Sequence, residues 1–333
     1  MKTHYVIPVF IPEKACPFRC VYCNQYHIAN TVEISSADKI HQIIEMYLES
    51  MPTSAWKRIA FFGGSFTGMS IEEQNEYLSI GKQYINKGKI NELQISTHPT
   101  YTTQPILDNL KNFGVRIIEL GAQSLDNEVL KQAGRGHTVE DVERASDLIL
   151  KNGFQLGLQM MIGLPGDTYE KSMKTAQKIV DLGANYTRIY PTLVIKDTHL
   201  EKLYQQKKYT PLSIEKAVKW TKDIVKLFEK HNVAILRIGL HPSEGLINKE
   251  VLIAGPFHVS FRELVDTARW KEIFNQIKQV NNATLSISIN SKQYNTAIGY
   301  KKGNKNDLLK VFKKVEFLKD DTISDWDFEY KIQ

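Results

Sequence analysis

The chain alternates short apolar runs with longer stretches of mixed polarity for most of its length. The apolar runs are rich in Val, Ile and Phe, which is typical of strands buried on both faces of a sheet. Seven of these runs predict strands, at residues 4–11, 57–62, 92–97, 115–122, 154–162, 186–190 and 233–239.

The stretches between these runs carry the polar signals of helix ends. Ser70 with Glu73 forms a capping box, and Thr138 with Asp141 forms a similar pair. Glycine at 114, 153 and 183 follows a helical stretch, where a left-handed residue closes the last turn. Helices are therefore predicted over residues 36–50, from residue 71 onward, and over 139–152, 168–182 and 213–231.

This order of elements indicates the fold class. A strand followed by a helix, repeated six or seven times, predicts a parallel sheet with right-handed crossovers. Such a sheet is either doubly wound or closes wholly or partly into a (β/α) barrel. The pattern changes after about residue 270, with an alternating strand at 283–289, a helical stretch at 291–312 broken by Gly299 and Gly303, and a strand at 315–318.

The composition is that of an ordinary globular protein. The chain has 333 residues, of which 42% are hydrophobic and 24% are charged. At about 150 residues per domain, this length indicates two domains, or one large domain with an appendage. The apolar stretches are shorter than the ~20 residues of a membrane span, and Pro8 and Pro12 interrupt the start. We therefore expect a cytoplasmic protein without a secretory signal or membrane contact.

The three cysteines of the chain lie together, and this is the first sign of chemistry. Cys16, Cys20 and Cys23 form a C-x3-C-x2-C array directly after the first predicted strand. Three thiolates on one loop can hold three irons of a 4Fe–4S cluster and leave the fourth iron open for another ligand. The alternatives are a zinc site that also uses His27, and three unrelated buried thiols.

Further candidates follow the ends of other predicted strands, where parallel α/β proteins place their functional residues. Glycines bring backbone close to a ligand, and the polar side chains can bind one, although each motif is also compatible with a plain strand-to-helix turn. His98, which follows the third predicted strand, could equally be a functional residue or an ordinary loop histidine. The candidates are Gly63 and Gly64, then Gln123, Ser124 and Arg135, then Gly163, Tyr190 and Lys196, and finally Arg237 and His241.

The cysteine array, with Tyr22 just before its third cysteine, resembles that of the radical S-adenosylmethionine (SAM) superfamily. The resemblance implies that SAM binds the open iron and is cleaved reductively to a 5′-deoxyadenosyl radical, which takes hydrogen from a substrate. It also implies contacts of Gly63 and Gly64 with the amino group of SAM, and of Gly163 near its adenine. Gln123 and Ser124 would then bind the ribose, and Arg135 would bind the carboxylate.

Two longer segments resemble the radical-SAM half of the Elongator catalytic subunit. They read ELGAQS…GRGHTVEDV from Glu119, and RIYPTLVIKDTHLEKLY…KYTPLSIEKAV from Arg188. This resemblance implies an enzyme that acts on the wobble uridine of tRNA. The chain stops before an acetyltransferase domain could follow, so we do not expect acetyl transfer by this chain alone. The short cysteine spacing also resembles that of oxygen-independent coproporphyrinogen oxidase.

Lysines are concentrated near the C-terminus. Between residues 291 and 314 they exceed the single acid, Asp307, by six charges, which equals the formal net charge of +6 of the whole chain. A basic stretch with a glycine-flanked turn resembles K-homology RNA modules, although a solvated helix face would have the same composition. The lysines are Lys292, Lys301, Lys302, Lys305, Lys310, Lys313 and Lys314.

Together these observations predict an α/β protein with a partial (β/α)6-type TIM barrel over residues 1–265 and a lysine-rich α/β appendage over residues 266–333. The predicted function is radical SAM chemistry on tRNA, with a 4Fe–4S cluster, SAM and an external electron donor of the flavodoxin or ferredoxin type. Tyr190, Lys196, Arg237 and His241 are the substrate-side candidates. The alternatives are an oxidoreductase acting on a small molecule such as a tetrapyrrole, and a non-catalytic RNA-binding iron–sulfur protein.

Overall fold

The structure is a computed structural model that describes residues 4–11, 15–16, 19–25, 27 and 36–333. The chain divides into two compact units. The first unit comprises residues 1–213 and 227–257, and the second comprises residues 214–226 and 258–333. The domain boundary that we predict after residue 265 stays a prediction.

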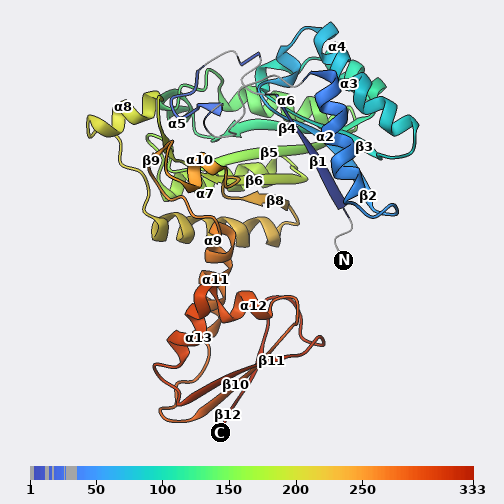
Figure 1. Ribbon diagram of the computed structural model, residues 1–333. Helices are drawn as coiled ribbons and strands as arrows, with labels where there is room; N and C mark the ends of the chain where they lie inside the picture. Colours follow the sequence, from blue (N-terminus) through green and yellow to red (C-terminus); the bar gives the residue numbers. More distant parts are fainter. Residues whose placement is uncertain (1–3, 12–14, 17–18, 26, 28–35) are drawn as a thin grey trace. The chain divides into compact units, whose positions relative to one another are not determined.

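A seven-stranded parallel sheet forms the centre of the first unit (Figure 1). Its strand order follows the chain, because each strand is linked to its neighbour through a helical crossover. The predicted strands and the α/β fold class are thereby confirmed. The strands are, in spatial order, β1 (His4–Ile11), β2 (Trp56–Gly63), β3 (Glu92–Thr97), β4 (Val115–Gln123), β5 (Gln155–Ile162), β6 (Tyr186–Pro191) and β8 (Ala234–Ile238).

The helices begin and end where the predicted caps place them. Ser70 and Thr138 each complete a capping box, with Glu73 and Asp141 respectively. Gly114 ends its helix in the left-handed conformation, with φ of 89°. The helices are α2 (Ala37–Glu49), α3 (Ile71–Asn86), α4 (Gln104–Phe113), α5 (Asn127–Gln132), α6 (Val139–Lys151), α7 (Tyr169–Asp181), α8 (His199–Gln205), α9 (Ile214–Lys230) and α10 (Glu244–Ile247).

The sheet curls into a half-barrel, as contacts across its concave face show. The guanidinium carbon of Arg188 on β6 lies 4.7 Å from the ring centre of Phe62 on β2. Arg58 on β2 lies 5.8 Å from the ring of Tyr186 on β6. Since three strands separate β2 from β6 in the sheet, these distances require strong curvature. The predicted partial barrel is therefore confirmed.

The two faces of this sheet differ more than the apolar strand pattern predicts. Ile59, Leu93 and Leu158 are fully buried on the convex face, which the helices cover (Figure 1). Several of their neighbours along the strands are polar, and among them Arg58 and Gln94 line the concave face. The interpretation that the strands are apolar on both faces is therefore incomplete.

An ion pair occupies the middle of the concave face. Glu119 on β4 is 1% exposed. Its Oε2 lies 2.7 Å from Nε of Arg188, and its Oε1 lies 2.9 Å from Nη2. Gln159 donates to the same carboxylate at 3.0 Å, and Gln94 also donates to it. Gly157 leaves room for this group, because a Cβ there would lie 2.6 Å from Cγ of Glu119.

Shorter elements close one side of the first unit. β7 (Val194–Ile195) pairs antiparallel with β9 (Leu252–Ala254). Leu193, Ile195 and Leu246 form a small buried cluster beside this pair. The pairing ties the segment after β6 to the segment after β8, which places both near the end of the sheet where the candidate residues gather.

The second unit has its own sheet and core. The sheet has the order β11-β10-β12, with β10 parallel to β11 and antiparallel to β12. Trp270, Leu285 and Ile287 are completely buried in this core. The predicted strands are confirmed, whereas α11 is not predicted by the sequence pattern. The elements are α11 (Phe261–Phe274), β10 (Thr284–Ile289), α12 (Tyr294–Ile298), η3 (Tyr300–Lys302), α13 (Gly303–Leu308), β11 (Lys314–Lys319) and β12 (Glu329–Ile332).

None of the helices in the described part of the chain combines the length and the apolar character needed to cross a membrane.

Replacing Glu119 with Gln should destabilise the first unit strongly. The change leaves the buried guanidinium of Arg188 without its counter-charge, and breaking such a pair costs about 3–5 kcal/mol. Asp147→Asn is the control, because it breaks an exposed pair with Lys151 that contributes about 0.3–0.5 kcal/mol. Urea denaturation measures both, and equal losses in the two variants would contradict the assigned role of the buried pair.

Candidate functional site

The cysteine loop follows β1 and carries three thiols. Cys16 is exposed, and Cys20 and Cys23 are half-buried. The amide of Cys23 donates to the carbonyl oxygen of Cys20 at 3.1 Å, which folds this part of the loop into a turn. The turn brings the backbones of Cys20 and Cys23 together, and all three thiols are at least partly accessible.

Arg135 contacts the loop through its guanidinium group. Nη1 donates to Sγ of Cys20 at 3.0 Å, and Nη2 donates to the carbonyl oxygen of Gly121 at 2.6 Å. The side chain is buried, yet the charges of Tyr22 and of the thiols outweigh burial and raise the pKa of Arg135. A permanent positive charge therefore lies against one candidate metal ligand.

Backbone hydrogen bonds fix the cysteine loop to two neighbouring elements. The amide of Val21 donates to the carbonyl oxygen of Ala133 at the end of α5, at 3.1 Å. The carbonyl oxygen of Val21 accepts from the amide of Leu200 in α8 at 2.7 Å. Tyr22 packs against both regions. The loop is thus held from two sides by elements far away in the sequence.

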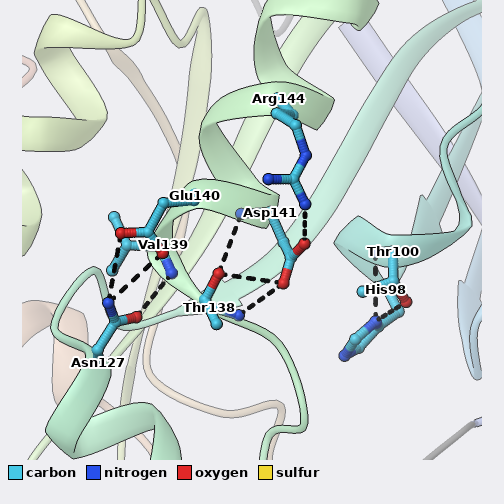
Figure 2. Close-up of polar contacts among 8 residues, drawn as sticks. All are labelled: His98, Thr100, Asn127, Thr138, Val139, Glu140, Asp141 and Arg144. Atoms are coloured by element: carbon cyan, nitrogen blue, oxygen red, sulfur yellow. Dashed lines mark hydrogen bonds and ion pairs between the residues drawn. The ribbon is translucent and has the colours of Figure 1, made fainter.

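The segment that carries Arg135 is fixed at its far end by the start of α6, which Figure 2 shows. The amide of Thr138 donates to the carboxylate of Asp141 at 2.8 Å. Asn127 accepts from the amide of Val139, also at 2.8 Å. Because α5 holds one end of the segment and the α6 cap holds the other, the position of Arg135 is well defined.

Two buried histidines lie beneath this segment. Nε2 of His98 lies 3.1 Å from the carbonyl oxygen of Arg135 and 3.1 Å from Nδ1 of His137. Burial and the charge of Arg135 lower the pKa of His98 to about 4 and that of His137 to about 3. Both are therefore neutral at pH 7, and they support the backbone of Arg135 without adding charge.

The glycine turn after β2 lies against the cysteine loop. Gly63 has φ of 116°, and a Cβ there would lie 2.2 Å from the carbonyl oxygen of Ile11, so only glycine fits. Gln25 donates to the carbonyl oxygen of Gly63 at 2.9 Å, and Gly64 donates to Ile11 at 2.7 Å. The hydroxyl oxygen of Ser65, the next residue, lies 3.9 Å from Sγ of Cys16.

Gln123 and Ser124 differ in whether their side chains are available for hydrogen bonds to a ligand. Oε1 of Gln123 is buried and, among the described residues, has no hydrogen-bond partner. Ser124 lies with its hydroxyl 3.5 Å from that of Thr175 and accepts from the amide of Asp126 at 3.3 Å. A bound ligand would satisfy the Gln123 oxygen, whereas the Ser124 hydroxyl already has partners within the chain.

Gly163 also has its polar groups engaged. Its amide donates to Asp167 at 2.8 Å, and its carbonyl oxygen accepts from the hydroxyl of Tyr209 at 2.6 Å. With φ of 75° and Leu212 only 2.8 Å from a hypothetical Cβ, this position requires glycine for packing. Its predicted place beside an adenine stays a prediction.

Among the substrate-side candidates, Tyr190 lies on β6 and Arg237 on β8, whereas Lys196 follows β7 and His241 follows β8. Tyr190 hydrogen-bonds to Arg188, and burial raises its pKa. Arg237 lies 3.4 Å from Nδ1 of His241, and this pair is more exposed. Lys196 is exposed, and its amide donates to the carbonyl oxygen of Val251 at 2.9 Å. Tyr190 is therefore linked to the concave face, whereas Lys196 and His241 face solvent.

Sequence reasoning did not select Glu119 and Arg188 as site residues. The available signal was a charged residue inside an apolar strand, since a charge that deep needs a partner. The strand pattern gave no means to pair the two residues, because they come from β4 and β6 and meet across the curled sheet.

The residues present fit an iron–sulfur cluster with a bound amino-acid-like ligand. Thiolates are the usual ligands of such clusters, and each binds a separate iron. Within the described ranges, no three His, Cys, Asp or Glu side chains converge on one metal-ion position. His27, which the zinc alternative requires, lies 3.1 Å from Asp197. The unpaired oxygen of Gln123 and the charge of Arg135 are suited to polar groups of such a ligand.

Comparison with known families decides the assignment. Residues 11–179, about half of the chain, match the radical SAM superfamily, and residues 184–271 match the Radical_SAM C-terminal domain. The chain belongs to the radical SAM superfamily. The superfamily uses a 4Fe–4S cluster and SAM, so these are the cofactors of this radical SAM enzyme.

Curated relatives resemble part of this radical SAM enzyme. A "tRNA uridine(34) acetyltransferase" of Methanocaldococcus infernus is 30% identical over 180 residues, which are 48% of this chain and 34% of the relative. Elongator complex protein 3 of Schizosaccharomyces pombe is 30% identical over 159 residues, which are 46% of this chain and 29% of the relative. The chain thus spans about a third of the length of these relatives.

A solved structure supports the same fold. The archaeal Methanocaldococcus infernus Elp3, with an N-terminal deletion, has a TM-score of 0.64 to this chain at 22% identity. The similarity covers 82% of this chain and 64% of the other. At this identity the likeness is one of fold.

Arg135→Gln should make the cluster of the reconstituted enzyme harder to reduce. A guanidinium beside a ligand sulfur favours the more negative reduced state, so its loss should lower the reduction equilibrium about tenfold, or ~59 mV for one electron. A potentiometric titration followed by electron paramagnetic resonance measures the shift, with iron content determined in parallel. Arg144→Gln is the control, because it removes an exposed arginine that pairs with Asp141. Equal potentials in the two variants would contradict this role.

Proposed function

We propose that this radical SAM enzyme acts on a nucleoside of tRNA and that Cys16, Cys20 and Cys23 hold its cluster. When bound, the cluster and SAM supply a 5′-deoxyadenosyl radical that takes a hydrogen atom from the substrate. An external donor of the flavodoxin or ferredoxin type supplies the electron. The chain itself binds and orients the cofactors and excludes water from the concave face.

One observation carries the cofactor part of the proposal. The cysteine loop, the glycine turn and the Arg135 segment are joined by hydrogen bonds at the same edge of the sheet. The buried, unpaired oxygen of Gln123 could accept a hydrogen bond from a ligand on the cluster. We assign Gly63 and Gly64 to the amino group of SAM and Arg135 to a dual role, against Cys20 and near the SAM carboxylate. Ser124 and Gly163 complete the assigned cofactor site.

The tRNA part of the proposal is supported by the relatives. Two of them are named for tRNA uridine modification or for Elongator, and each is 30% identical to nearly half of this chain. The concave face offers a polar interior that suits a nucleobase, because amide and guanidinium groups line it. Tyr190, which is linked to this interior, is assigned to the substrate side together with the more exposed Lys196, Arg237 and His241.

The reconstituted enzyme should form 5′-deoxyadenosine when it receives dithionite and SAM under anaerobic conditions. Cys20→Ala should lose this product together with most of its iron, because one cluster ligand is missing. Chromatography of the products and an iron assay measure both. Ser50→Ala, a change at an exposed helix end, serves as the control. No product from a protein with an intact cluster would contradict radical chemistry in this chain.

Removing the gene for this chain should change the modified nucleosides of tRNA. The measurement is mass spectrometry of nucleosides from hydrolysed tRNA of the deletion strain and its parent. Return of the missing nucleoside on complementation with the wild-type chain, but not with Cys20→Ala, links the change to the cluster. Identical nucleosides in both strains, with altered tetrapyrroles, would overturn the tRNA proposal in favour of a small-molecule substrate.

A further inference from the structure

A short turn in the second unit has an unusual backbone. It comprises residues 299–303 between α12 and α13, and we name it the lysine turn. Lys301 has φ of 50° and Lys302 has φ of 60°, so two consecutive lysines adopt the left-handed conformation. L-residues avoid this conformation because Cβ crowds the next carbonyl oxygen. Such strain persists only where the surroundings enforce it, and it is common at binding sites.

Thr267 of α11 and the buried Asn304 of α13 hold the turn in place. The amide of Tyr300 donates to the hydroxyl of Thr267 at 2.8 Å. Asn304, which is 2% exposed, donates to the carbonyl oxygen of Thr267 at 3.0 Å and to that of Ala297 at 3.1 Å. Gly299 is packed so closely that a Cβ would lie 2.9 Å from Thr267. The backbone that carries Lys301 and Lys302 is therefore held in one position by hydrogen bonds and packing.

The charges of the lysine turn are available for a partner. Lys301 and Lys302 are exposed, and no described carboxylate lies within ion-pair distance of either. Asp307, the single acid between residues 291 and 314, is bound by Lys271 and Lys310, each at 2.6 Å. The nearby acidic group is thus already neutralised, and the positive charge of the turn faces solvent.

We propose that the lysine turn binds the phosphate backbone of the tRNA substrate. Lysine ammonium groups bind phosphates as point charges without reading sequence, and residues 291–314 contain no arginine for bidentate recognition of bases. A glycine-flanked turn between two helices beside a three-stranded sheet is also how K-homology modules clamp a nucleotide backbone. Here the turn has three residues between its glycines, one more than in those modules.

This inference rests on the proposed function, since it assumes an RNA substrate. It adds a second contact that lies outside the barrel and in residues beyond the matched superfamily domains, which end at residue 271. The barrel would then select the nucleoside, while the lysine turn would contribute affinity that is independent of sequence.

The test compares two variants of the full reconstituted enzyme in binding to a labelled tRNA transcript. Lys301→Gln with Lys302→Gln should weaken binding about tenfold at low salt. Each phosphate-binding lysine contributes about 0.7–0.9 to the steepness with which log affinity decreases as log salt rises. Losing two such lysines should therefore make this slope shallower by about 1.5. Fluorescence anisotropy between about 50 and about 200 mM salt measures both quantities.

The matched control is Lys207→Gln with Lys208→Gln in the first unit. It removes two adjacent exposed lysines and changes the net charge equally, and Lys207 also has a positive φ, of 60°. This control should keep the wild-type affinity and slope. Equal weakening by the two pairs would show an effect of total charge and would overturn the proposal.

The remaining outcomes separate this proposal from the proposed function. Wild-type affinity for tRNA in the variant with both lysines replaced by Gln would overturn the proposed role of the lysine turn, while tRNA would remain the proposed substrate. A wild-type enzyme that does not bind tRNA at any salt would overturn both. If poly-glutamate displaces tRNA as well as unlabelled tRNA does, the turn binds an acidic protein rather than RNA, and the proposal fails.

Lys301→Gly with Lys302→Gly should lose affinity for tRNA without losing thermal stability, because glycine relieves the strained backbone.

Discussion

A charge buried inside a protein requires an opposite charge beside it, and in this barrel Glu119 and Arg188 meet that requirement for each other. They stand on β4 and β6, and their contact passes over Gly157 on the strand between them. The sheet curls around this pair, as the contact of Arg188 with Phe62 on β2 shows. The same curvature gathers the carboxyl ends of its strands around one opening, which is where the cysteine loop, the glycine turn and Arg135 meet.

The site at that opening depends on contacts between loops rather than on any one loop. Val21 joins the cysteine loop to α5 and α8, and Gln25 joins it to Gly63. Arg135 then places a permanent charge against Cys20. Such preorganisation matters for a redox centre, because hydrogen bonds and charge near the ligand sulfurs set its potential. The neutral histidines beneath Arg135 support its backbone without changing that charge.

Much of the fold could be predicted from the sequence, because it depends on local chemistry. The seven parallel strands coincide with apolar runs, and the helix ends coincide with caps such as Ser70 and Thr138. The polar concave face and α11 could not be predicted in this way. Polar residues such as Gln94 and Gln159 are stabilised inside the barrel because Glu119, on the strand between them, accepts their hydrogen bonds.

For the site, the sequence by itself determined the chemical groups. It places three thiols, the candidate donors, within eight residues, and a glycine at position 63 after the second strand. Only the tertiary structure decided how these groups combine, since Cys20 and Arg135 are separated by more than a hundred residues and meet through strand order and curvature. Local propensity acts over a few residues, whereas a side chain's partner depends on where distant strands end.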